Sequence, residues 1–313
     1  MNSPNDHQNT EAAASLTGDV TGAGVFQVVL DGYDAVYDAL PRSETFNRLW
    51  RANAYGGDFP EEFAHIGFLT IAEAQRMREL LQAGADDVIA DLACGAGGPG
   101  LWMAKQTGAS LIGADPSPAG LLAARARARA VGLADRSRFH QGTFEHTNLP
   151  DSAVDAAMSV DAFQYAPDKR TALAEIFRIL RPRGRVAVIA FEVDPAKVAG
   201  VPVLGVDPVP NYLPLFEAAG FGVEAYEETA GWRERVHAAF GAIVDASGAL
   251  TAEMGERAAA GVLAEAMLTV QIQPYPRRVL AMARRPGLLG GDRWTTRSLL
   301  TRPCAARSAP RCA

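Results

Sequence analysis

Residues 88–100 read VIADLACGAGGPG, and this stretch decides the fold. It predicts a buried strand over residues 88–92, a glycine turn over residues 95–98 and the start of a helix. Glycine suits a turn that approaches a ligand closely, because it carries no Cβ and adopts positive φ freely. The first turn of the helix presents free N–H groups and a partial positive charge. A polar, nucleotide-like ligand is therefore expected on this turn.

Short apolar runs alternate with amphipathic stretches along the rest of the chain. Further strands are expected over residues 110–115, 139–142, 155–161, 185–192, 223–228 and 277–284. Helices are expected over residues 71–81, 101–106, 117–131, 169–180 and 213–219. This alternation predicts an α/β, Rossmann-like fold, in which a seven-stranded, mostly parallel sheet has helices on both faces. Ligands of such sheets bind at the carboxyl ends of the strands, which here carry Asp91, Asp115, residues 142–144, Asp161 and Glu192.

Composition describes an ordinary globular protein. The chain has 313 residues, of which 48% are hydrophobic and 21% charged, and its net charge is −6. This balance argues against nucleic acid as a partner, and no apolar run is long enough to predict a membrane span. The odd number of cysteines predicts a reducing, cytoplasmic setting, and no Cys/His spacing predicts a metal site. Cys94 is interpreted as a small packing residue of the glycine turn rather than as a nucleophile. The oligomeric state stays open, with a homodimer as one option.

The glycine pattern alone does not identify the nucleotide. Residues 95–100 match G-x-G-x-x-G, and Asp115 follows about 20 residues further on, as in dinucleotide-binding domains. Asp91, however, precedes the first glycine at the end of the strand. A carboxylate there would repel a pyrophosphate but could hold an ammonium group, while Asp115 could accept the hydroxyls of a ribose. S-adenosylmethionine (SAM) carries both groups.

Four stretches resemble the motifs of class I SAM-dependent methyltransferases, of the small-molecule type found in secondary metabolism. ADLACGAGG resembles their first motif, commonly DxGCGxGG, and LIGADPS resembles the second, whose acid binds the ribose. LPDSAVDAAMSVDAFQYAPD resembles the segment around the fourth strand, and EIFRILRPRGRVAV resembles the helix and strand that follow. The resemblance covers about residues 45–230 and 275–284 and implies SAM as cofactor, with S-adenosylhomocysteine as product.

The resemblance also implies which residues contact the cofactor. The methionine end is expected to lie on Asp91, Ala93, Gly95 and Gly97. The ribose and the adenine are expected to contact Asp115, Pro116, Gly142, Thr143 and Phe144. The methyl-bearing end and its cover are expected to involve Asp161, Gln164 and Tyr55. Ala93 departs from the family by replacing a usual glycine, and Thr143 stands where an aspartate often bonds the adenine amino group.

Methyl transfer is an in-line displacement at a sulfonium, so positioning can supply much of the rate and a general base is optional. The candidates for catalysis are His237, Glu192, Asp161 and His65. Further side chains expected near the methyl group are Gln164, Tyr165, Tyr33 and Tyr37. His65 and His237 lie in segments expected to roof the pocket, although a surface or structural role is commoner for a histidine.

Two helical segments are expected to shape the pocket for the methyl acceptor. Residues 21–84 carry many aromatic side chains, which form either a small helical core or a lid over an apolar ligand. Residues 231–274, with helices expected over 232–246 and 251–270, are inserted before the last strand. The full division is a disordered N-terminus (1–20), a lid (21–84), the cofactor-binding core (85–230), the insertion (231–274), the last strand (275–285) and a disordered tail (286–313).

These segments are rich in Ala, Leu, Val and aromatic residues, which predicts a small, fairly apolar organic acceptor with an O, N or C nucleophile. Three rival interpretations remain at this stage. One is a SAM-binding enzyme with non-methylating chemistry, such as a cyclisation or elimination. The others are a nicotinamide-dependent oxidoreductase and a cofactor-binding module without catalysis.

Overall fold

The computed structural model describes residues 22–201 and 206–287. The expectations for residues 1–20 and for the tail beyond residue 287, including Cys304 and Cys312, lie outside the described residues. None of the described helices combines the length and the hydropathy that a membrane span requires.

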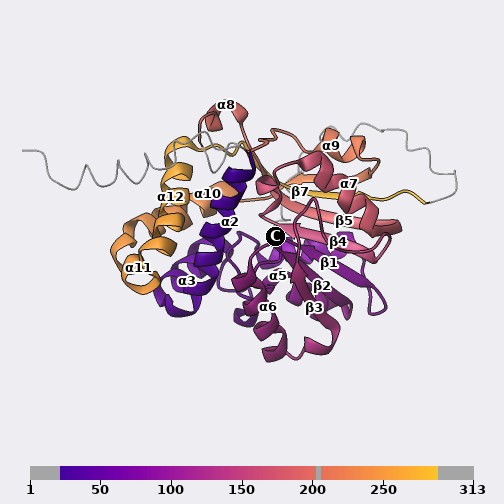
Figure 1. The fold of residues 1–313 in the computed structure, drawn as a ribbon, viewed down its shortest axis with the longest axis horizontal. Coiled ribbons are helices and arrows are strands. Elements are labelled where there is room, and N and C mark those ends of the chain that lie inside the picture. Colours follow the sequence, from indigo (N-terminus) through magenta and orange to yellow (C-terminus); the bar gives the residue numbers. More distant parts are fainter. Residues whose placement is uncertain (1–21, 202–205, 288–313) are drawn as a thin grey trace, which may run out of the picture.

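A seven-stranded sheet forms the centre of the molecule (Figure 1), in the order β3-β2-β1-β4-β5-β7-β6. Its strands are β1 (Val88–Leu92), β2 (Ser110–Asp115), β3 (Ser137–Gln141), β4 (Val154–Val160), β5 (Leu180–Glu192), β6 (Gly222–Glu228) and β7 (Arg277–Arg284). The first five strands pair in parallel, and β7 runs antiparallel between β5 and β6. The predicted fold class is therefore confirmed.

Helices cover both faces of the sheet, and each face has its own apolar core. One core includes side chains of α4 (Ile71–Leu81), α5 (Gly98–Thr107) and α6 (Pro118–Ala130). The other includes α7 (Lys169–Ile179) and α9 (Leu213–Ala218). Local signals explain where these helices begin: the side chain of Ser117 accepts from Gly120 N–H at the start of α6, and Asp168 caps α7.

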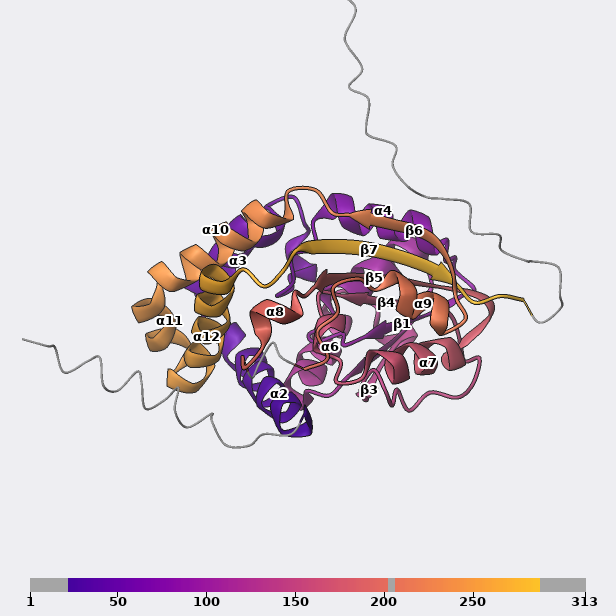
Figure 2. The same cartoon turned by 90° about the horizontal axis from the view of Figure 1, so that it is seen from above.

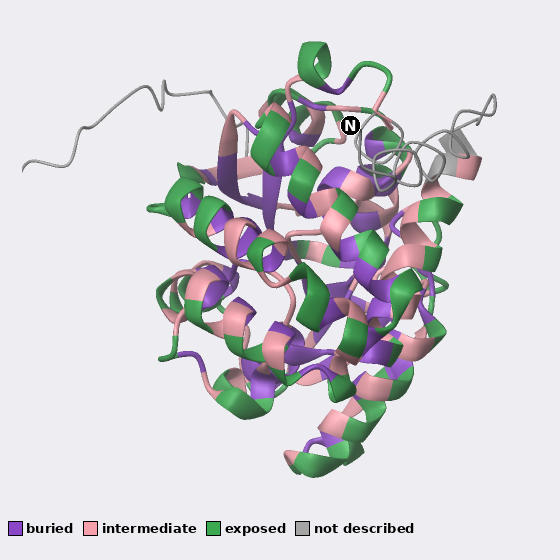
Figure 3. Cartoon of the chain, turned by 90° about the vertical axis from the view of Figure 1, so that its left-hand side faces the viewer, coloured by how far each residue is buried: buried purple, intermediate pink, exposed green. Residues whose placement is uncertain are grey.

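A block of helices from both ends of the described chain stands beside the sheet. Its members are α2 (Gly22–Ala39), η1 (Leu40–Arg42), α3 (Glu44–Trp50), η2 (Arg51–Tyr55), η3 (Glu61–Phe63), α10 (Trp232–Asp245), α11 (Ser247–Met254) and α12 (Glu256–Ile272). Figures 1 and 2 both show α2 beside α12, although most of the chain separates them. Figure 3 shows the molecule from the side of this helical block, which is the left-hand side of Figure 1. The helices carry exposed residues on their outer faces and buried residues on their inner faces. Shorter elements are η4 (Ala134–Arg136), η5 (Phe163–Tyr165) and α8 (Pro195–Val198).

The inserted segment differs from the prediction. One helix was expected over residues 251–270, whereas the chain forms α11 and α12 with a break at Gly255. Gly255 has φ 83°, which ends α11 because this backbone conformation cannot continue a right-handed helix. The break turns α12 back along α2, so the insertion packs on the N-terminal helix.

The N-terminal aromatics lie in two different surroundings. Trp50 packs against Phe46, with ring centroids 5.3 Å apart, and against Phe240 of α10 at 5.6 Å, inside the helical core. Tyr33 and Tyr37 of α2 instead line a pocket at the edge of the sheet. The segment is a core at one end and a pocket wall at the other.

Candidate active site

A pocket lies at the carboxyl ends of β1 to β4, beneath α2. Its empty space, including the open mouth, is about 840 Å³. The sheet side is formed by Ala93, Asp115, Pro116, Ser117, Gly142, Thr143, Phe144, Glu145, Val160, Asp161, Ala162 and Tyr165. The opposite side is formed by Phe26, Val29, Leu30, Tyr33, Tyr37, Ile66 and Gly67. One side thus carries the motif residues, and the other is mainly apolar.

The glycine turn has the backbone that the sequence predicts. Gly95 and Gly97 have φ of 49° and 74°, and Ala93 takes a φ of 58° despite its side chain. Gly100 serves close approach, since a Cβ there would overlap Oδ2 of Asp91. The turn therefore brings the start of α5 directly onto the acid at the end of β1.

Two carboxyl groups are buried around this turn. Asp115 accepts hydrogen bonds from Gly95 N–H at 2.7 Å and from Ser117 N–H at 2.8 Å. Burial raises the pKa of Asp115 to about 6. Asp91 is 2% exposed, and burial, together with the charge of Asp115, raises its pKa to about 8. Its Oδ2 atom has no hydrogen-bond partner among the described residues. A cationic ligand beside these groups would favour their ionised forms and lower both pKa values.

The helix α2 closes over the turn. The hydroxyl of Tyr37 lies so near Gly95 that a Cβ at this glycine would overlap it. Oδ1 of Asp34 accepts from the hydroxyl of Ser117 at 2.6 Å and from Ala119 N–H at 3.0 Å. Asp34 thus adds a carboxylate from α2 to the N-terminus of α6, where a negative charge is stabilising. These contacts hold α2 against the cofactor side of the pocket.

The third strand ends in a tight turn that lines the pocket. Thr143 donates its N–H to the carbonyl of His146 at 3.0 Å, and its hydroxyl accepts from His146 N–H at 3.2 Å. The N–H group and the hydroxyl of Thr143 thus both form hydrogen bonds within the turn. Gly142 and Phe144, which were expected beside the adenine, also line the pocket.

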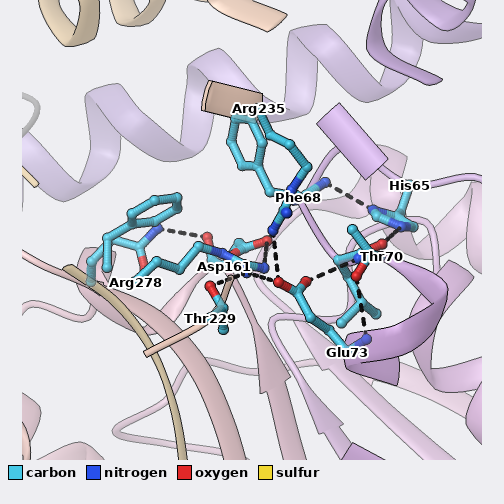
Figure 4. Close-up of polar contacts among 12 residues, drawn as sticks. His65, Phe68, Thr70, Glu73, Asp161, Thr229, Arg235 and Arg278 are labelled. Atoms are coloured by element: carbon cyan, nitrogen blue, oxygen red, sulfur yellow. Dashed lines mark hydrogen bonds and ion pairs between the residues drawn. The ribbon is translucent and has the colours of Figure 1, made fainter. Parts of the chain in front are cut away.

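Asp161 belongs to a buried network of charges (Figure 4). Arg278 of β7, which is fully buried, contacts Asp161 through Nε at 2.7 Å and Nη2 at 3.0 Å. The same arginine contacts Glu73 at 2.9 Å through Nη1, and Arg235 contacts Glu73 at 2.7 Å. Oδ2 of Asp161 also accepts from Phe68 N–H at 2.6 Å. The predicted catalytic carboxylate lines the pocket, but its two oxygens are engaged in this network.

His65 lies beside the same network (Figure 4) and has a fixed tautomer. Its Nδ1 accepts from Gly67 N–H at 3.1 Å, so Nε2 is the protonated nitrogen and donates to the carbonyl of Leu69 at 3.1 Å. Burial lowers the pKa of His65 to about 3, against a smaller opposing effect of Asp161. Both nitrogens are occupied by the backbone, which favours a structural role.

The other two catalytic candidates lie away from this pocket. His237 is exposed on α10 and is absent from the described pocket wall. Glu192 is 1% exposed and pairs with Nε of Arg277 at 2.7 Å, while the Tyr226 hydroxyl donates to it at 2.6 Å. The structure therefore does not bring His237 and Glu192 together with Asp161 in one site.

Several predicted cofactor residues lie behind the wall rather than in it. Gln164 donates its amide to the carbonyl of Asp161 at 2.7 Å. Tyr55 is buried against His65, with ring centroids 4.3 Å apart. Asp91, Gly95 and Gly97 shape the turn beneath the lining residues.

One acid that sequence reasoning missed lies next to the pocket. Glu265 of α12 accepts a hydrogen bond from the Tyr165 hydroxyl at 2.7 Å, and the Tyr33 hydroxyl lies 3.3 Å from it. Tyr33 and Tyr165, both expected near the methyl group, line the pocket. The available signal was a single acid in the apolar run AAAGVLAEAMLTV at residues 258–270.

The residues present fit SAM. Asp115 stands at the end of β2 in the pocket wall, and the oxygen of Asp91 that has no partner among the described residues suits a positively charged ligand. A pyrophosphate, by contrast, would bring further negative charge to two buried carboxyl groups.

Comparison with known proteins agrees with this geometry. Residues 90–188 match a family described as a methyltransferase domain. The chain is 30% identical to the methyltransferase GfsG of Streptomyces halstedii over 207 residues, which cover 59% of this chain and 74% of GfsG. It is 28% identical to the 27-O-demethylrifamycin SV methyltransferase of Amycolatopsis mediterranei (strain S699), covering 53% of this chain and 58% of that enzyme.

Solved structures share the fold at low sequence identity. The [4+2]-cyclase SpnF has a TM-score of 0.66 and 20% identity, with 83% of this chain and 95% of that chain covered. Geranyl diphosphate C-methyltransferase from Streptomyces coelicolor A3(2) has a TM-score of 0.53 and 19% identity, with 75% and 84% covered. The relatives' names and the matching domain set aside the nicotinamide oxidoreductase and the non-catalytic module. The chain belongs to the class I S-adenosylmethionine-dependent methyltransferases of the small-molecule type.

Proposed function

We propose that the chain transfers the methyl group of SAM to an O, N or C nucleophile of a small, largely apolar organic acceptor, by in-line displacement. The observation that carries this proposal is the continuity of the pocket. Its motif-bearing side holds Asp115 and Ala93, and its far side is built of Phe26, Val29 and Leu30. An apolar acceptor seated on α2 would thus share one pocket with the cofactor.

Separate residues of the chain would then bind the cofactor and position the acceptor. Asp115 binds the ribose hydroxyls, the carboxylate of Asp91 balances the positive methionine end, and Pro116 flanks the adenine. The helix α2 excludes water and positions the acceptor, which supplies much of the rate in a displacement of this kind. SAM, when bound, supplies the methyl group as an electrophile.

Replacing Asp115 tests the cofactor site. The Asp115→Ala variant loses the side chain that accepts from Gly95 and Ser117 and that would bind the ribose. We expect SAM affinity to fall about 100-fold or more, measured by calorimetry. Asp135→Ala, an exposed aspartate in η4, is the matched control and should bind SAM normally. Normal affinity in a folded Asp115→Ala variant would contradict the assignment.

A non-methylating reaction is the alternative, because the [4+2]-cyclase SpnF shares the fold. The acceptor assay separates the two. The assay begins with 27-O-demethylrifamycin SV, the compound that appears in the name of the Amycolatopsis relative. It continues with smaller phenols. Methyl transfer gives one S-adenosylhomocysteine for each methylated product, whereas product formed without S-adenosylhomocysteine would favour the alternative.

A further inference from the structure

A cluster of three polar side chains stands at the apolar end of the pocket. Its members come from separate elements: Tyr33 from α2, Tyr165 from η5 and Glu265 from α12. Tyr165 donates to Oε1 of Glu265 at 2.7 Å, and Tyr33 to Oε2 at 3.3 Å. The two hydroxyls are themselves 3.3 Å apart. The tyrosines face the pocket, and the carboxyl group lies behind them.

No cation within residues 22–201 or 206–287 balances this carboxyl group. Among the described residues, neither a lysine, an arginine nor a histidine forms an ion pair with Glu265. The titratable groups that face it are Tyr33, Tyr165 and Tyr275, the last from the segment before β7. The hydrogen bonds of Glu265 come from α2 and η5 alone, although α10 and α11 also pack on α12.

These surroundings suit a role for Glu265 as a proton acceptor better than a role as a permanently charged group. Burial raises the pKa of Glu265, against the opposing effect of the two tyrosine hydroxyls. Burial also raises the pKa of Tyr33 and of Tyr165 well above the usual range, so both keep their protons at neutral pH. A carboxylate with a raised pKa is a stronger base, and a protonated tyrosine between it and the pocket can pass a proton on.

We propose that Tyr165 and Glu265 remove the proton of a hydroxyl acceptor, with Tyr33 holding the acceptor oxygen, so that this enzyme is an O-methyltransferase. This inference rests on the proposed function. Tyr165 is the catalytic residue because it faces the pocket. Glu265 acts through it, as the positioning and proton-accepting residue.

The step balances without a further reactant. A lone pair of the acceptor oxygen forms the new C–O bond with the methyl carbon, as the C–S bond breaks and its electron pair stays on sulfur. The acceptor's hydroxyl proton moves to the oxygen of Tyr165, and the tyrosine's own proton moves to Glu265. Glu265 releases that proton to solvent after the products leave.

Two phenols distinguish a proton acceptor from a structural carboxylate. The hydroxyl of 4-methylphenol resembles that of tyrosine, with a pKa of about 10, whereas 4-nitrophenol is largely ionised at about pH 8. With Glu265→Gln we expect the kcat for 4-methylphenol to fall about 100-fold and that for 4-nitrophenol to change little. Tyr165→Phe should act in the same way, and the double variant should lose no more than either single variant.

The matched control is Glu256→Gln, the same change at an exposed glutamate on the first turn of the same helix. It should leave both rates at wild-type values. An equal loss with both phenols in Glu265→Gln would overturn the inference, because it would show a structural role. If the wild type methylates amines or carbon nucleophiles but neither phenol, the inference fails while the proposed function stands.

A second readout needs no turnover. Carbon-13 NMR of labelled glutamate, with Glu265→Gln used for assignment, follows the ionisation of this carboxyl group in the protein with SAM bound. We expect it to titrate above the ordinary glutamate range and to be ionised at the assay pH. A carboxyl group that stays protonated across the active pH range would overturn the inference, since it could accept no proton. Absence of SAM binding would instead contradict the cofactor assignment.

Discussion

Ala93 occupies a backbone conformation that suits glycine better. Its φ of 58° falls in the left-handed region, which costs an L-residue roughly 1–2 kcal/mol relative to the right-handed conformation. The turn tolerates this because the N–H groups of Ala93 and Cys94 both bond to the carbonyl of Ala114, at 2.8 and 3.2 Å. The strain is thus stored where the chain must turn sharply between β1 and α5.

Replacing Ala93 with glycine should therefore stabilise the protein. The relief of strain exceeds the added chain entropy of the unfolded state, which is about 0.4–1 kcal/mol, so we expect a gain of about 0.5–1 kcal/mol. Urea unfolding of Ala93→Gly measures it. Ala96→Gly, in the same turn but without positive φ, should lose stability instead. A loss in both variants would show that Ala93 is not strained.

At the scale of single residues, the contiguous stretch 88–100 predicted the glycine turn with Asp91 ahead of it, because the chain itself places them together. The contacts of these residues with the cofactor stay predictions. The histidines show the limit: His65 has both nitrogens bound to the backbone, and His237 points outward. The partners of His65 lie only two and four residues further along the chain, but no known motif marks this turn. Glu265 was missed for a different reason, because its partners Tyr33 and Tyr165 lie 232 and 100 residues away in the sequence.

Elements far apart in the chain are joined by the buried charges around Arg278. This side chain links β7 to Asp161 at the end of β4 and to Glu73 at the start of α4, which is 205 residues away in the sequence. Glu73 also completes a capping box with Thr70, so one carboxylate caps α4 and holds the network together. Such long-range pairs have no counterpart in the periodicity of the sequence.

Breaking the network at Asp161 should destabilise the whole fold. Asp161→Asn leaves the buried guanidinium of Arg278 with Glu73 as its remaining anion, and loss of one partner of a buried pair costs about 3 kcal/mol. Asparagine tolerates the positive φ of 53°, so backbone strain is not the cause. Thermal or urea unfolding measures the loss.

The exposed pair of Asp38 and Arg42 provides the control for this experiment. Its side chains are 72% and 56% exposed, and Asp38→Asn should cost less than about 0.5 kcal/mol. Similar losses of unfolding free energy in the two aspartate variants would mean that the buried pair of Asp161 and Arg278 stabilises the fold no more than an exposed pair does.

At the scale of the molecule, the seven strands lie within a few residues of their predicted ranges, because each strand, turn and helix unit is local. The break of the insertion at Gly255 was not foreseen, since alanine-rich stretches favour one long helix. That break is what places Glu265 beside Tyr33 and Tyr165. The cofactor half of the pocket thus follows from sequence motifs, whereas the acceptor half depends on helices that meet only in the folded chain.

The buried acids make the whole molecule sensitive to pH. The pKa values of Asp115 and Asp91, about 6 and about 8, lie above the value of about 3.9 for an aspartate in the unfolded chain. The folded protein therefore binds protons that the unfolded chain has lost. The stability from these two groups is fully present below about pH 4 and is lost as pH rises through about 6 and 8.

A cationic ligand reverses this dependence, because it favours the ionised carboxylates. We expect the stabilisation by SAM, measured as the rise in Tm at a fixed SAM concentration, to grow from about pH 6 to about pH 8. Asp91→Asn keeps the shape of the side chain but cannot ionise, so its SAM-induced rise should depend on pH less steeply. A rise in Tm that is flat or falls over this range in the wild type would show that the positive end of SAM does not pair with Asp91.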